Sequence, residues 1–371
     1  MIRGACPGLH APMSTGDGLL VRVKPPGGRL CANAATTLAR AAARHGSGII
    51  ELTARANLQI RGLTPISAAH FAAAMVAAGL AHPDPATERR RNLLAPPLAD
   101  ADGLTEALEA LLIDTPALDA LPDKFLFAVD AGGVCPAPLI ADITLRCDGA
   151  HHWIVIGDRQ ALCPPDTALA AVEALARRAG ARRMRDVPAS EQFGDLIPIP
   201  FAAPPTARLA GFLPDPAAFA IGLPFGQTDT PTLIALADLS RRYADGQLRL
   251  APNRTIFLAP VAEAPTLAAA VIALDLIADA ADPRLRIAAC IGNPGCGSAT
   301  VPTRSDAARL ATIAFSGTIH VSGCAKGCAH GAADLTLVGR DGRYDLVRHG
   351  RAGEPPTLHG LTIEDVARQC A

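Results

Sequence analysis

The chain repeats itself at long range, and this repeat constrains its fold more than any other feature. Residues 21–28, a short apolar run closed by prolines and glycines, have a counterpart 198 positions later in residues 219–226. A helix-forming run follows in each copy, over residues 33–45 and 232–244, and glycine breaks the pattern after it. Apolar strands are predicted next in both copies. The pattern therefore predicts two copies of one unit that contains helix and strand.

A second pair of segments supports the duplication. Residues 142–155 form a predicted hairpin through Asp148-Gly149, and residues 334–346 form another through Asp341-Gly342, at an offset of 192. Two blocks at nearly one offset favour a duplicated α+β unit of roughly 190–200 residues over chance resemblance in an alanine-rich sequence. The predicted organisation is a half-domain (1–70), an α+β domain (71–185), a linker (186–215), a second half-domain (216–262) and a second α+β domain (263–371).

Composition excludes several classes of protein. Lys+Arg is 34 and Asp+Glu is 35, so the chain lacks the net positive charge of a nucleic-acid binder, and its aromatic content of 4% is too low for base stacking. The sequence contains no apolar run of about 18 residues and no signal-peptide core, which predicts a cytoplasmic protein without a membrane partner. Lysine is rare: Lys24, Lys124 and Lys326 stand against 31 arginines.

The ten cysteines fall into two groups. Six are scattered (6, 31, 135, 147, 163 and 370) and are expected to be small core residues, because disulfides are not expected without a signal peptide. The other four form Cys290-x5-Cys296 and Cys324-x3-Cys328, with glycines around both pairs. Thiolates favour zinc or an iron–sulfur cluster, and the five-residue gap fits a zinc knuckle poorly. A [4Fe–4S] cluster is therefore favoured, with zinc, core packing and a redox disulfide as the alternatives.

This cysteine pattern resembles that of the sulfite and nitrite reductase superfamily. Three further segments are similar: Thr53 to Gln59 (T-x-R-x-x-x-Q), Arg91-Asn92, and Leu121 to Phe125 (L-P-x-K-F). The resemblance implies an internally duplicated α+β fold, with ferredoxin-like half-domains and two larger α+β cluster and substrate domains. It also implies that the cluster ligands are the four cysteines and that Arg55, Gln59, Arg91 and Lys124 bind the substrate. Lys326, one of only three lysines, lies inside the second cysteine pair and is added to the predicted substrate-binding residues.

Departures from the reductase pattern point to one family within this superfamily. Leu126 stands where the reductases have a second lysine, which weakens the case for reduction of sulfite or nitrite. Residues 6–9, 15–22, 127–133 and 320–330 resemble the precorrin-3B synthases of aerobic cobalamin biosynthesis. That resemblance implies a monooxygenase that uses O2 to hydroxylate precorrin-3A at C20 and forms a γ-lactone.

The same resemblance implies further cofactors and partners. These are a mononuclear non-haem iron, whose ligands the sequence does not assign, and NADH as ultimate reductant, acting directly or through a partner redox protein. No catalytic residue is assigned. Two alternatives stay open: a sirohaem-dependent sulfite or nitrite reductase, and a non-catalytic iron–sulfur or zinc protein that transfers electrons.

Overall fold

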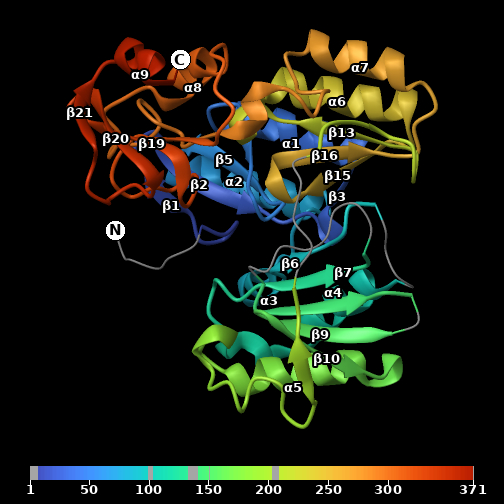
Figure 1. The fold of residues 1–371 in the computed structure, drawn as a ribbon. Coiled ribbons are helices and arrows are strands. Elements are labelled where there is room, and N and C mark those ends of the chain that lie inside the picture. The colour runs from blue at the N-terminus through green and yellow to red at the C-terminus, as the bar shows by residue number, and fades with distance from the viewer. Residues whose placement is uncertain (1–6, 99–102, 133–140, 150, 203–208, 371) are drawn as a thin grey trace.

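The fold is built on four sheets (Figure 1). The structure is a computed structural model, and it describes residues 7–98, 103–132, 141–149, 151–202 and 209–370. Two five-stranded sheets belong to the repeated half-domains, and a six-stranded and a five-stranded sheet belong to the larger units. In Figure 1 the six-stranded unit lies below the rest of the molecule, and the C-terminal unit lies beside the half-domains.

The first half-domain has the strand order β1-β2-β5-β4-β14. Helix α1 (Ala32–His45) begins where the Cys31 sulfur accepts a hydrogen bond from the Ala34 amide. Helix α2 (Pro65–Ala77) begins with a capping box between Thr64 and Ser67. The strands are β1 (Met13–Thr15), β2 (Gly18–Val23), β4 (Ile49–Leu52), β5 (Leu58–Leu63) and β14 (Gln227–Asp229).

The second half-domain repeats this arrangement in the order β12-β13-β16-β15-β3. Helices α6 (Thr230–Tyr243) and α7 (Ala264–Ala273) correspond to α1 and α2, and α6 packs against α1. The strands are β3 (Arg29–Cys31), β12 (Gly211–Leu213), β13 (Ala218–Gly222), β15 (Gln247–Ala251) and β16 (Thr255–Leu258).

The two half-domains exchange a strand. β3 comes from the first repeat but pairs with β15 of the second, whereas β14 comes from the second repeat and pairs with β4 of the first. Each exchanged strand follows a turn with a left-handed residue, Gly27 at φ 57° and Phe225 at φ 54°. One hydrophobic core, which includes Leu38 and Leu236, runs through both half-domains. The halves therefore form one folding unit.

The two larger units also correspond. Strands β6, β7 and β8 run parallel, as do β17, β18 and β19, and an antiparallel hairpin continues each sheet. The two-residue turn Asp341-Gly342 has positive φ at both positions, as the predicted hairpin requires. The strands of the first unit are β6 (Leu93–Leu94), β7 (Phe127–Asp130), β8 (Ile143–Cys147), β9 (His152–Ile156), β10 (Arg159–Cys163) and β11 (Pro198–Pro200); those of the second are β17 (Ile287–Ala289), β18 (Ile319–Ser322), β19 (Ala333–Arg340), β20 (Arg343–Gly350) and β21 (Leu358–Leu361).

Helices cover these sheets. Helices α3 (Pro85–Arg90), α4 (Leu104–Asp114) and α5 (Ala168–Ala179) belong to the first unit, and α8 (Thr303–Leu310) and α9 (Ile363–Cys370) to the second. The predicted boundary at residue 70 falls within α2, and the predicted linker 186–215 contributes β11 and β12 to two sheets. Residues 203–208 of that linker lie outside the described part of the chain. The proposed domain limits stay a prediction.

The scattered cysteines are only partly as expected. Cys147 and Cys163 are buried in the core of the six-stranded unit. The prediction was wrong for Cys31, which is exposed and caps α1 because its sulfur accepts a backbone amide. Cys6 and Cys135, and the side chain of Cys370, lie outside the described residues. Among the helices of the described ranges, none has the length and apolar character needed to cross a bilayer.

Candidate functional site

The two cysteine pairs meet at one edge of the C-terminal sheet. Cys290 directly follows β17, and the second pair begins two residues after β18 ends. Because β17 and β18 are parallel neighbours, their carboxyl ends lie side by side. The Cys290 amide donates to the Val321 carbonyl at 3.2 Å, and the Gly323 amide donates to the Cys290 sulfur at 3.1 Å. The topology thus brings together two pairs that are 28 positions apart in sequence.

Three of the cysteines, Cys290, Cys296 and Cys324, lie within electrostatic range of the Cys328 thiol. The pKa of Cys328 is raised by burial and, after that, by Cys290, Cys324 and Cys296. Within the described ranges, however, no three His, Cys, Asp or Glu side chains are close enough to hold a single metal ion. A tetrahedral zinc would bring its sulfurs within about 4 Å of each other, because each Zn–S bond is about 2.3 Å long. The Gly323 amide directed at the Cys290 sulfur fits an anionic thiolate ligand, as in an iron–sulfur cluster.

A buried charge network fixes the first cysteine loop against the first half-domain. Arg61 on β5 donates through Nη2 to the Gly295 carbonyl at 2.6 Å and pairs with Asp17 at 3.0 Å. Its Nη1 lies 3.4 Å from Glu51, which also pairs with Arg304 at the start of α8. The side chains of Arg61 and Glu51 are only 5% and 10% exposed. This network links the polar face of the first sheet to the loop that carries Cys290 and Cys296.

A glycine contact reinforces that junction. A Cβ atom on Gly16 would lie 2.2 Å from the Gly297 nitrogen and 2.8 Å from the Cys296 carbonyl carbon. The turn between β1 and β2 therefore packs backbone to backbone on the loop, which no larger residue allows without displacement.

Three of the predicted substrate-binding residues lie on the half-domain face and the second cysteine loop. Arg55 is half-buried in the turn between β4 and β5, and its guanidinium has no hydrogen bond or ion pair within the described part of the chain. Gln59 accepts a hydrogen bond from Arg22 at 2.8 Å and donates to Glu51 at 3.5 Å. Lys326 is exposed and donates to Ser298 at 3.0 Å, so it connects the two cysteine loops.

The other two predicted substrate-binding residues lie in the six-stranded unit. Arg91 is 4% exposed, and its guanidinium is bonded to Glu88, Glu109 and the Lys24 carbonyl. These contacts occupy most of its donors and tie the end of α3 to α4 and to the end of β2. Its role in substrate binding stays a prediction. Lys124 is half-buried just before β7. Leu126, at the position of the missing lysine, is 1% exposed and packs in the core shared with the half-domains.

Comparisons with known proteins agree with this architecture. The nitrite/sulfite reductase ferredoxin-like half domain family matches residues 11–78 and 214–273, the two half-domains of the fold. The structure of the Mycobacterium tuberculosis NirA protein superimposes with a TM-score of 0.69, covering 94% of this chain and 79% of that one. At 19% identity this likeness concerns the fold alone.

A closer relationship decides the family. A protein of Sinorhizobium sp, named precorrin-3B synthase, is 33% identical over 408 residues, which cover 97% of this chain and 85% of that protein. The chain belongs to the precorrin-3B synthase family. Both resemblances predicted from the sequence, to this family and to the duplicated reductase fold, are thereby confirmed.

The mononuclear iron predicted for this precorrin-3B synthase gains no support from the described residues. His320 on β18 is fully buried, its ring lies 6.1 Å from that of His330, and burial lowers its pKa to about 4. It is therefore neutral at pH 7. Since the described residues include no group of three ligands for one ion, neither histidine is assigned to the iron, and its ligands stay unassigned. The use of NADH likewise stays a prediction.

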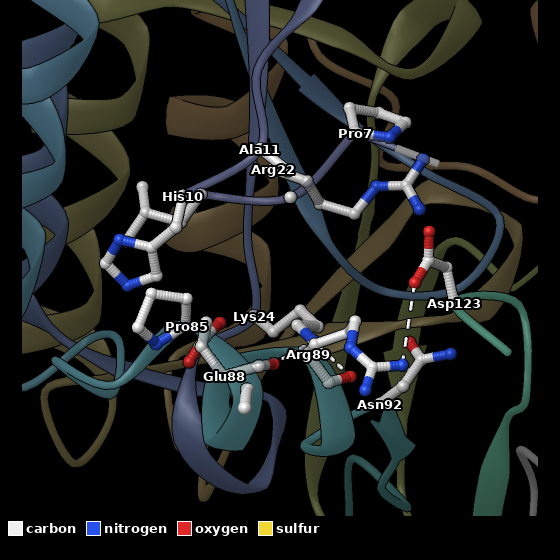
Figure 2. Close-up of a pocket in the computed structure, with 13 residues that line it drawn as sticks. Pro7, His10, Ala11, Arg22, Lys24, Pro85, Glu88, Arg89, Asn92 and Asp123 are labelled. Carbon is white, nitrogen blue, oxygen red and sulfur yellow. Dashed lines mark hydrogen bonds and ion pairs between the residues drawn. The ribbon is translucent and has the colours of Figure 1, made fainter. Parts of the chain in front are cut away.

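A pocket next to α3 was not predicted from the sequence. A cavity of about 240 Å³ is lined by residues of the N-terminal segment, β2 and α3, together with Asn92 and Asp123 of the two segments that resemble the reductases (Figure 2). Its basic side chains are Arg22, Lys24 and Arg89. The available signal was the rarity of lysine, since Lys24 is one of three and follows Arg22 by two positions at the end of a strand.

Proposed function

We propose that this protein is an oxygen-dependent monooxygenase that converts precorrin-3A to precorrin-3B. In this reaction one atom of O2 enters at C20, the other leaves as water, and two electrons and two protons come from a reductant. The ring A acetate closes the γ-lactone. The observation that carries the proposal is the meeting of four thiols beside a polar half-domain face, in a chain that aligns with a precorrin-3B synthase along 97% of its length.

In this proposal, Cys290, Cys296, Cys324 and Cys328 hold a [4Fe–4S] cluster. When bound, the cluster supplies one-electron transfer. The Gly323 amide, which already donates to the Cys290 sulfur, stabilises negative charge on that ligand. Electrons come from NADH through a partner redox protein, because the sequence shows no dinucleotide-binding motif.

Substrate binding is assigned to Arg55, Gln59, Lys124 and Lys326, four of the residues predicted from the sequence. The guanidinium of Arg55 has its donors available for a carboxylate of the tetrapyrrole, in the bidentate geometry that arginine favours. Lys326 places an ammonium group between the two cysteine loops. Gln59 is held by Arg22 and Glu51, so it presents a fixed amide on the same sheet face. Lys124 completes the proposed set.

Leu126 favours oxygenation of a large substrate over reduction of a small anion. A buried leucine at this position leaves one cation fewer near the substrate. Six-electron reduction of sulfite or nitrite needs concentrated positive charge and proton donors.

The experiment uses protein purified without oxygen. Iron, zinc and acid-labile sulfide are measured with the visible spectrum, and precorrin-3A is then supplied with reductant under 18O2, 16O2 or argon. We expect iron with sulfide, a broad cluster absorption, and one 18O atom in the product. Equal turnover under argon would contradict the monooxygenase, tightly bound sirohaem would indicate the reductase, and zinc without sulfide would exclude the cluster.

A further inference from the structure

The pocket next to α3, called here the Lys24 pocket, has the charge and shape of a subsite for an alkyl carboxylate. Figure 2 shows the N-terminal segment on one side, with Pro7, His10 and Ala11, and the α3 residues Glu88 and Arg89 on the other. Its volume of about 240 Å³ is below the range of roughly 300–1,000 Å³ for drug-sized ligands. It therefore suits one arm of a large molecule.

Positive charge exceeds negative charge around this pocket. Among the residues that line the pocket, the cations are Arg22, Lys24 and Arg89, and the carboxylates are Glu88 and Asp123. Outside the lining, Arg89 also lies 4.0 Å from Asp119. The carboxylates of the lining are already engaged: Glu88 accepts from Arg91, and Asp123 lies 3.7 Å from Arg89. Within the described residues no ion pair joins Lys24 to a carboxylate, so this ammonium group can take one from a ligand.

Lys24 supplies the donor for such a group. Its ammonium nitrogen donates to the Glu88 carbonyl at 2.5 Å and lies 3.4 Å from the Arg89 carbonyl, so its partners in the pocket wall are uncharged backbone oxygens. An ammonium group has three donors, and a ligand oxygen can accept the third. Around it the pocket is apolar, with Pro7, Leu9 and Pro85 in its wall. A charged end and an apolar wall match a carboxylate on a short hydrocarbon arm.

We propose that the Lys24 pocket binds one acetate or propionate arm of the tetrapyrrole substrate. The proposal rests on the proposed function for the identity of the substrate, but the pocket and its charge do not depend on it. Asn92 and Asp123 belong to the segments that also carry Arg91 and Lys124, so the pocket adjoins the predicted substrate-binding residues in sequence.

The electrostatic surroundings of Lys24 favour an anion beside its ammonium group. Burial lowers the pKa of Lys24 to about 8, Glu88 opposes this shift, and the neighbouring cations Arg91, Arg22 and Arg89 lower it further. A bound carboxylate stabilises the ammonium form and raises this pKa, so binding takes up a proton at pH 8 to 9. His10 also lines the pocket, and a pH range above 7.5 avoids the ordinary titration of histidine.

The test is binding of uroporphyrin III, a tetrapyrrole with acetate and propionate arms, followed by fluorescence at pH 7.5 and 9.5. We expect Lys24→Met to weaken binding by about 10-fold or more, the loss expected for a hydrogen bond to a charged group. Arg185→Met removes the same charge from an exposed side chain in the short 3-10 helix Met184–Asp186 and should bind as the wild type does. Wild-type binding should also weaken at pH 9.5, and the variant should lose this dependence.

Two results of the comparison between Lys24→Met and the wild type would overturn the proposal. One is equal affinity of Lys24→Met and the wild type at both pH values. The other is that competition by succinate depends on Lys24 although binding of uroporphyrin III itself does not. That result would assign the pocket to a free small acid. If Lys24→Met fails to fold, the pH dependence of wild-type binding decides, and its absence contradicts the proposal. Lys24-dependent binding without conversion of precorrin-3A would overturn the proposed function instead, whereas conversion with a KM unaffected by Lys24→Met would overturn this subsite.

Discussion

Arg61 donates a hydrogen bond through Nη2 to the carbonyl of Gly295 at 2.6 Å, although 234 positions separate them in the sequence. Through this contact the first half-domain holds the loop between Cys290 and Cys296. The same guanidinium pairs with Asp17 and Glu51, so one buried side chain links a sheet, a turn and the proposed cluster loop. The half-domain therefore positions the loop that carries two of the proposed cluster ligands.

Replacing Arg61 with methionine should destabilise the protein and lower its cluster content. The variant removes the arginine partner of Asp17 and leaves Glu51 paired with Arg304 alone, which should lower the free energy of unfolding by about 3–5 kcal/mol. Urea denaturation and the iron and sulfide content measure both effects. Arg177→Met, which removes an exposed pair with Glu173 on α5, should cost less than about 1 kcal/mol and keep the cluster. Full iron content in Arg61→Met would show that the loop does not need this contact.

Serine at position 290 should remove most of the iron and acid-labile sulfide, because the Cys290 sulfur lies at the junction of β17 and β18. The visible absorption of the cluster should fall with them. Cys31→Ser is the matched control, since Cys31 is an exposed cysteine that caps α1. A Cys290→Ser protein with its iron and sulfide intact would contradict the assignment of the four cysteines as ligands.

A methyl group on Gly16 should push the first cysteine loop away from the half-domain. The added Cβ would lie 2.2 Å from the Gly297 nitrogen, so Gly16→Ala should cost about 1–3 kcal/mol and reduce cluster retention. In Gly331→Ala the Cβ meets no atom within 4 Å, and this variant should behave as the wild type. Thermal melting together with iron analysis compares the two; equal stability of both would rule out the tight contact.

The stability of the protein should respond to Lys24 above pH 8. Its pKa is about 8 in the folded protein and 10.5 when unperturbed, so between these values the unfolded chain binds more protons. The destabilisation caused by burying the ammonium is present below pH 8 and is relieved as the pH rises to about 10. Urea midpoints of the wild type and Lys24→Met at pH 7.5 and 9.5 measure this. The wild type should gain stability relative to the variant at pH 9.5, and a constant difference would refute the shift.

The sequence predicted those parts of the fold that local patterns specify. Turn residues and the alternation of apolar and polar residues are visible in the sequence itself. They predicted the hairpin at Asp341-Gly342 and the duplication of residues 21–28 in 219–226. The meeting of the cysteine pairs followed from their spacing. The exchange of β3 and β14 could not be predicted, because three-residue strands have no measurable period and their partners lie in the other repeat.

The residues around the two cysteine loops and the substrate-binding residues were predicted less completely, because their partners also lie far away in the sequence. Nothing near Arg61 in the sequence indicates its contact with Gly295. Arg91 was assigned to substrate from a motif, but its partner Glu109 on α4 becomes visible only once α3 and α4 pack together. Long-range ion pairs decide which arginines are available to a ligand, and the sequence alone does not specify those pairs.

The strand exchange predicts that one side chain stabilises both half-domains. Leu30 on β3 is fully buried, and its strand pairs with β15 of the second half-domain, while α1 of the first begins two residues later. Leu30→Ala should therefore lower the free energy of unfolding by about 2–5 kcal/mol while keeping one cooperative transition for both halves. Far-UV circular dichroism follows that transition, and Trp153 on β9, the single tryptophan, reports the six-stranded unit separately. Leu162→Ala, at a leucine 51% exposed on β10, should cost far less. Separate melting of the two half-domains in Leu30→Ala would show that the exchanged strands do not couple them.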